Sequence, residues 1–228
     1  MGWLAIILGF IPGFAWLYFY MQEDPHPEPK RLIFKTFCYG MLGAIIALGL
    51  ELAFNQYVPS GGPGILFPLL SLAGLSLIEE VTKFLSARSA VRKSPAFDEP
   101  IDAMIYSLVA ALGFATLENI GALTSPFLQG GIAAANANIF EMISFRFVGA
   151  TLLHALTGAV IGYHWAWSIR EFGRVRILLT GIVVATVLHA FFNYLILSFE
   201  SYFQPIIFLM IVGFFVLADF EKFKNKKI

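Results

Sequence analysis

The sequence predicts an all-α polytopic membrane protein with about seven transmembrane helices. Two features of its composition predict this: 58% of the 228 residues are hydrophobic and only 13% are charged, giving a mean hydropathy of +0.77. A third observation is that the apolar residues gather in runs of about 18–25 residues, long enough to cross a bilayer as helices. Soluble domains do not have this composition. We therefore expect a single membrane-embedded domain over residues 1–228.

Seven apolar segments follow one another along the chain. The first has no positive flank and no small-residue cleavage site, so it predicts a retained span rather than a cleaved signal peptide. Pro-rich QEDPHPEPK, Gly/Pro-rich PSGGPG and polar SPFLQGGIAAANAN mark connections, and the last leads into a short interfacial helix around Ile139–Arg146. The predicted spans are Gly2–Met21, Leu32–Phe54, Ile65–Ala87, Asp102–Leu123, Phe147–Ile169, Ile177–Phe199 and Phe203–Phe220.

The basic residues predict the orientation of these spans. Thirteen of the fifteen Lys and Arg residues lie beside the ends of the first, third, fifth and seventh spans. By the positive-inside rule those ends face the cytoplasm, which places the N-terminus outside and the C-terminus inside. Only Lys83 and Arg146 depart from this pattern, and Arg146 is expected at the membrane interface together with Glu141.

Polar side chains inside the spans are few, and those of four spans fall at a similar depth. Burying an ionisable group in a bilayer costs several kcal/mol, so such groups normally face a protein interior or a water-filled cavity. With the orientation above, they share a layer between the bilayer centre and its outer face, which predicts a common polar centre. Its candidate members are Glu79, Glu80, Glu118, His154, His189 and Asn193.

Each candidate also has a purely structural interpretation. One glutamate of the pair could serve only to neutralise Lys83, which is one helical turn away from both. Glu118 could be a structural hydrogen-bond acceptor, and His154 a satisfied core histidine. Asp102, at the start of its span, is expected to cap that helix.

The combination of Glu, His and Asn favours hydrolysis in one of two forms. A buried carboxylate could act as general base on a water while His and Asn stabilise the oxyanion. Alternatively, two His and one or two Glu could bind a divalent metal that activates the water. The sequence contains neither HExxH nor GxSxG, and its single cysteine, Cys38, excludes an intramolecular disulfide or a cysteine-based zinc site.

Several ordered motifs lie along these spans. They are Glu79-Glu80-x-x-Lys83, Phe114-x-x-x-Glu118, a His in the next span, and His189-x-x-x-Asn193, together with the context EPIDAMIYSLVAALGFATLENI. In these motifs the sequence resembles the PrsW membrane proteases, which belong to the wider CAAX-protease and bacteriocin-processing superfamily, and the resemblance runs from Pro12 to about Tyr194. In the CAAX-processing branch the second motif ends in His rather than Glu, and the first ends in Arg one position later than Lys83. A prenylated substrate is therefore not expected.

The resemblance implies an intramembrane endopeptidase of the bacterial cell membrane. Its expected substrate is a single-span anti-sigma factor, cut near the extracytoplasmic side in a site-1 type cleavage. In the glutamate-type mechanism of the superfamily no cofactor is needed, Glu79 or Glu80 activates water, and His189 and Asn193 stabilise the oxyanion. The i,i+4 spacing from Glu79 to Lys83 favours Glu80 as the freer carboxylate, with Lys83 as a charge partner.

Two other functions would use the same polar layer. A transporter or channel could relay protons or cations along it, although no internal repeat supports this. A catalytically inactive scaffold could bind the transmembrane helix of a partner. No basic tract indicates nucleic-acid binding, the lipid bilayer is the expected surrounding, and the oligomeric state is not predicted.

Overall fold

Eight α-helices and one short 3₁₀ helix, with no strand, make up the part of the chain that the structure describes. This structure is a computed structural model, and it describes residues 2–62, 64–136, 139–199 and 201–224. The all-α prediction is confirmed, while the single domain over the whole chain stays a prediction. The elements are α1 (Gly2–Tyr20), η1 (Met21–Glu23), α2 (Lys30–Asn55), α3 (Leu66–Val91), α4 (Pro100–Asn136), α5 (Ile139–Val148), α6 (Ala150–Arg170), α7 (Val175–Ser198) and α8 (Phe203–Lys224).

Six stretches of this fold are long and apolar enough to cross a membrane. They are Trp3–Glu23, Lys30–Asn55, Pro100–Ser125, Glu141–Arg170, Val175–Ser198 and Phe203–Phe223. The remaining predicted span corresponds to α3, which has 26 residues but carries Glu79, Glu80 and Lys83 within its apolar sequence. The protein is therefore a multi-pass membrane protein, and its least apolar long helix is the one that carries the charges.

The segment after the fourth span is not the loop that the sequence predicts. The expectation of a connection through SPFLQGGIAAANAN is wrong as far as Asn136, because α4 continues as a helix of 37 residues to that point. The Ala-rich sequence before Asn136 has high helix propensity, which explains the extension; residues 137 and 138 lie outside the described part. The short helix expected around Ile139–Arg146 is present as α5. The helical conformation is interrupted at Gly149, and α6 begins at Ala150.

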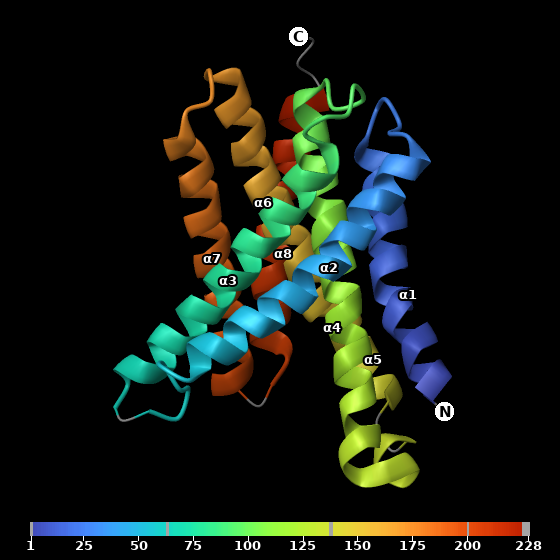
Figure 1. The fold of residues 1–228 in the computed structure, drawn as a ribbon, viewed down its shortest axis with the longest axis vertical. Helices are drawn as coiled ribbons and strands as arrows, with labels where there is room; N and C mark the ends of the chain where they lie inside the picture. Colours follow the sequence, from blue (N-terminus) through green and yellow to red (C-terminus); the bar gives the residue numbers. More distant parts are fainter. Residues whose placement is uncertain (1, 63, 137–138, 200, 225–228) are drawn as a thin grey trace.

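The ends of the helices form two groups. Figure 1 shows the α1–α2, α3–α4 and α6–α7 connections together with the C-terminus at the upper end, and the N-terminus at the lower end. The basic clusters lie at the upper end of the bundle. This agrees with the predicted orientation, which requires that basic residues flank the spans at one side of the membrane only. Which end faces the cytoplasm stays a prediction.

The long helix α4 is the centre of the bundle. In the most apolar 18-residue stretch within Pro100–Ser125, 89% of the residues are buried. Glycines of its neighbours let the backbones approach closely: a Cβ at Gly40 of α2 would overlap the carbonyl oxygen of Ala110, and one at Gly162 of α6 would lie 2.5 Å from that of Ala103. The small-residue pair of Gly158 and Gly162 is thus a helix-packing face.

The outer helices leave apolar side chains uncovered. In the most apolar 18-residue stretches of the α2, α7 and α8 spans, only 28% of the residues are buried. Ile45, Leu48, Val183 and Phe214 are each more than half exposed. Such a large apolar surface is expected where helices face lipid tails.

Candidate functional site

The buried charges of α3, Glu79, Glu80 and Lys83, lie within about one helical turn of one another. Glu79 and Glu80 are adjacent, so their side chains leave the helix about 100° apart and reach different neighbours. Lys83 Nζ lies 2.6 Å from Glu80 Oε1, in a pair of which each side chain is at most 1% exposed. The i,i+4 spacing favours Glu79 as the partner of Lys83, and this expectation is wrong. Glu80 is therefore the neutralised carboxylate and Glu79 the freer one.

Lys83 also contacts α6. Its ammonium donates to Thr157 Oγ1 at 3.2 Å and lies 3.1 Å from His154 Nδ1. The Phe114 ring of α4 lies 5.7 Å from the same ammonium, in cation–π range. Lys83 thus links α3, α4 and α6 at the level of the two glutamates.

His154 of α6 faces a carboxylate with each of its ring nitrogens. Its Nε2 lies 2.8 Å from Glu118 Oε2 of α4, and its Nδ1 lies 3.9 Å from Glu79 Oε2 of α3. The Phe114 ring packs 5.6 Å from the imidazole, one helical turn before Glu118. Glu118 and Phe114 therefore fix this imidazole from the side of α4.

His189 of α7 repeats the same arrangement from the other side. Its Nδ1 lies 2.7 Å from Glu80 Oε1, and its Nε2 lies 3.7 Å from Glu79 Oε2. The rings of His154 and His189 are nearly perpendicular, with centroids 5.1 Å apart. Both imidazoles are thus held by one carboxylate and directed at another.

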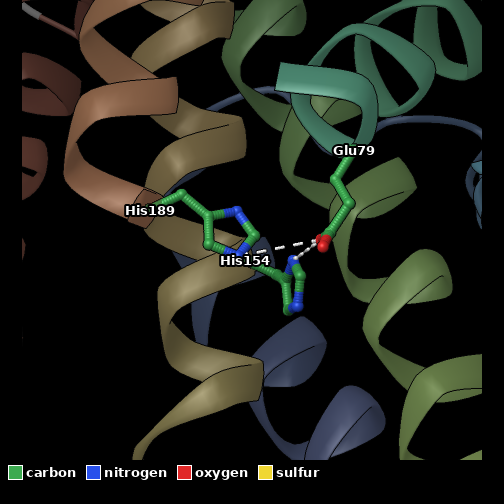
Figure 2. A group of neighbouring side chains, drawn as sticks. All are labelled: Glu79, His154 and His189. Atoms are coloured by element: carbon green, nitrogen blue, oxygen red, sulfur yellow. Dashed lines mark ion pairs between the residues drawn. The ribbon is translucent and has the colours of Figure 1, made fainter. Parts of the chain in front are cut away.

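Glu79 Oε2 is the point at which these groups converge. Figure 2 shows both imidazoles directed toward the Glu79 carboxylate, with dashed lines for the two ion pairs. This oxygen is buried, and among the described residues it has no hydrogen-bond partner. A buried carboxylate oxygen without a partner is energetically costly unless a ligand or a proton completes it.

The three side chains fit a divalent metal ion. One ligand atom from each of Glu79, His154 and His189 can be chosen so that all lie within 4.8 Å of one another. Two His nitrogens and a carboxylate oxygen are a common ligand set for zinc. Metal-bound histidines usually donate their other ring N–H to a carboxylate, and Glu118 and Glu80 are in that position.

The depth of the site follows from its distance to the basic ends of the helices. The separation ranges from eleven residues, between Glu80 and Val91, to eighteen residues, between Pro100 and Glu118. At about 1.5 Å per residue this is about 17–27 Å along the helices, beyond the midplane of a hydrocarbon core about 30 Å thick. The residues therefore share a layer in the half of the bundle away from the basic loops.

Five of the six residues predicted from the sequence come together here, and the sixth does not. Asn193 is half-buried one turn after His189, and among the described residues no hydrogen bond or ion pair joins it to the other five. Asp102, predicted as a helix cap, accepts hydrogen bonds from the backbone N–H groups of Asp98 and Glu99 at 2.9 and 2.8 Å.

Sequence reasoning missed Arg146 of α5. It was expected at the interface, but its Nη2 lies 3.5 Å from Glu118 Oε2 and its Nε donates to Asn119 Oδ1. Asn119 in turn donates to Thr151 Oγ1 at 3.0 Å. One signal was available: Arg146 and Lys83 are the two basic residues outside the positive-inside pattern, and both lie at the site.

A pocket of about 580 Å³ opens beside this centre between α2 and α4. Figure 1 shows these two helices crossing and then diverging toward the lower end. The pocket wall is mainly apolar and includes Phe114, Ile45 and Leu48, with three charged residues, Glu118, Arg146 and Glu51. Glu51, a carboxylate within the α2 span, was also missed by the sequence analysis.

Comparisons with known proteins agree on one family. A family model described as PrsW family intramembrane metalloprotease matches residues 28–218. The chain is 30% identical to Protease PrsW of Geobacillus kaustophilus (strain HTA426) over 86% of its own length and 81% of the relative's. It is 27% identical to Protease PrsW of Bacillus subtilis (strain 168) over 96% and 95%, respectively. No solved structure matches the chain.

Proposed function

Because this chain belongs to the PrsW family of intramembrane proteases, we propose that it hydrolyses a peptide bond at the centre formed by Glu79, His154 and His189. One observation carries the proposal: a buried, unpartnered carboxylate oxygen faces two imidazoles, each of which is held by a further carboxylate. The pocket beside this centre, whose wall includes Glu118, supports the proposal by offering a route for a peptide.

The protonation of the two imidazoles limits the chemistry. Glu118 and Glu80 accept hydrogen bonds, so a neutral His154 carries its proton on Nε2 and a neutral His189 carries its proton on Nδ1. The remaining nitrogen of His189, Nε2, then directs its lone pair at Glu79 Oε2, 3.7 Å away. His154 Nδ1 faces both the Lys83 ammonium, at 3.1 Å, and Glu79 Oε2, at 3.9 Å. The lone pairs of His189 Nε2 and Glu79 Oε2 that face each other require a positive charge between them, either a proton or a cation.

The two choices give two forms of one hydrolysis. In the glutamate-type form, Glu79 takes a proton from the attacking water and later delivers it to the leaving amine nitrogen. In the metal-dependent form, Glu79, His154 and His189 would hold a divalent cation, which would supply the Lewis acidity that activates a water. The outer carboxylates favour the metal-dependent form, because they orient both imidazoles as metal ligands usually are oriented.

We propose that the substrate is a single-span membrane protein of the anti-sigma factor class in a bacterial cell membrane. The depth of the centre supports cleavage near the extracytoplasmic side, since it lies beyond the midplane from the basic helix ends. The exposed apolar faces of α2 and α7 support a bilayer location, from which such a substrate would approach.

The test is cleavage of a purified single-span anti-sigma factor by the full-length protein in proteoliposomes. Glu79→Gln, His154→Ala and His189→Ala should each abolish cleavage, while Glu141→Gln, at an exposed carboxylate of α5, should not. A chelator should stop the reaction and a divalent metal restore it; activity that resists chelation would select the glutamate-type form. Normal cleavage by the folded Glu79→Gln protein would refute the proposed centre.

A further inference from the structure

The pocket between α2 and α4 contains a charge that the catalytic centre does not use. Glu51 of α2 is half-buried in its wall, and among the described residues it has no ion-pair or hydrogen-bond partner. An ionisable group within a span usually faces a partner or a pathway, because leaving it uncompensated is costly. A molecule that enters the pocket can therefore supply the partner of Glu51.

The other charges of the pocket are already compensated. Arg146 contacts Glu118 through Nη2 and Asn119 through Nε. Glu118 in turn contacts both Arg146 and His154. The charge that the pocket offers to a ligand is thus negative and resides on Glu51, so a cationic group complements it and an anionic group does not.

The pocket borders the catalytic centre through two residues of its wall. Phe114 lines the pocket and packs its ring 5.6 Å from His154. Glu118 also lines the pocket and lies 2.8 Å from His154 Nε2. A peptide that reaches Glu79 from this side passes along the wall that carries Glu51.

We propose that Glu51 is a specificity-determining residue that binds a Lys or Arg side chain of the substrate, close to the scissile bond. This inference rests on the proposed protease function and names a feature of its substrate. The long aliphatic stems of Lys and Arg suit a mostly apolar wall, and their charged ends would reach the carboxylate. The predicted occupant is an extended segment from the outer end of a single-span protein, apolar except for a basic residue.

Binding can be measured without cleavage. The probes are synthetic single-span peptides with an apolar membrane segment and an outer flank in which Lys, Gln or Glu is placed at each position in turn. Binding is measured by fluorescence in detergent micelles to the full-length Glu79→Gln protein, in which hydrolysis is disabled. At one or a few positions, the Lys peptides should bind roughly tenfold or more tightly than their Gln counterparts.

Substitutions of Glu51 then test whether this residue is the cause. Adding Glu51→Gln should abolish the preference for Lys, and Glu51→Lys should transfer it to the Glu peptide at the same position. Glu141→Gln is the matched control, since it removes an exposed carboxylate outside the pocket, and it should leave the preference unchanged. The combination of Glu51→Lys with the Glu peptide distinguishes a direct contact from a structural effect. If Glu51 contacts the peptide side chain, exchanging the two charges should restore tight binding, whereas a structural defect would persist.

Two outcomes separate this inference from the function on which it rests. If the Lys, Gln and Glu peptides bind equally at every position, or if Glu51→Gln retains the preference, the inference is overturned even where the protein cleaves its substrates. If the preference is present but the wild-type protein never cleaves the bound peptides, the pocket assignment holds and the proposed protease function fails.

Discussion

Replacing Lys83 with Met should destabilise the protein strongly, since it strips the buried Glu80 of its countercharge. The ammonium and the carboxylate are 2.6 Å apart, so their attraction is about 6 kcal/mol at an effective dielectric constant of about 20. Desolvation of both groups offsets part of this, and removing one partner of such a pair typically costs about 3–5 kcal/mol. His189, which also contacts Glu80, cannot replace the lost charge while it is neutral.

The assay is reversible unfolding in mixed detergent micelles, and a double-mutant cycle identifies the cause. Glu80→Gln combined with Lys83→Met leaves no buried charge unpaired, so the double variant should recover most of the lost stability. Thr157→Val, which removes one hydrogen bond of the same ammonium, should cost only about 1 kcal/mol. Wild-type stability in Lys83→Met, or a double variant less stable than Lys83→Met, would refute the reasoning.

Three further predictions concern other parts of the structure. Gly40→Ala should lower the free energy of unfolding by about 1–3 kcal/mol, because the added methyl overlaps the backbone of α4; Gly49→Ala, with open space around it, should be neutral or stabilising, and equal effects in micelle unfolding would contradict this. Glu118→Gln should reduce the cleavage rate about 10–100-fold through the imidazole that it positions, and an unchanged rate would exclude that role. Burial raises the pKa of Glu28 above its ordinary value of 4.5. Between pH 4.5 and the folded-state pKa, the folded state therefore binds more protons than the unfolded state. The free energy of unfolding should fall as pH rises through this interval. Glu28→Gln should flatten the dependence of the unfolding temperature on pH, and a slope equal to that of the wild-type protein would count against this account.

The sequence alone reveals the spans and most of the site, for the same physical reason. Apolar runs must cross the bilayer, and a polar group inside such a run needs a partner. Glu79, Glu118, His154 and His189 can therefore be assigned to one layer from their positions along the spans. Depth along a helix depends only on residue count, which the sequence provides.

What could not be predicted depends on the rotation of each helix about its axis. Asn193 shares a helix face with His189 by spacing, yet it forms no hydrogen bond with the site residues in the described part of the chain. The choice of Lys83 between its two neighbouring glutamates depends on how α3 packs against α6 and α7. That packing is set by contacts between distant segments, which spacing along one helix does not report.

The central claim is that Glu79 acts at the centre of a peptide-bond hydrolysis within the membrane. It is tested most directly by incubating the reconstituted protein with a single-span substrate in water enriched in heavy oxygen, and by analysing the products by mass spectrometry. The wild-type protein should produce a new C-terminus that carries solvent oxygen, at a bond near the extracytoplasmic side, and the folded Glu79→Gln protein should produce none. The same labelled product from Glu79→Gln at the wild-type rate would contradict the claim.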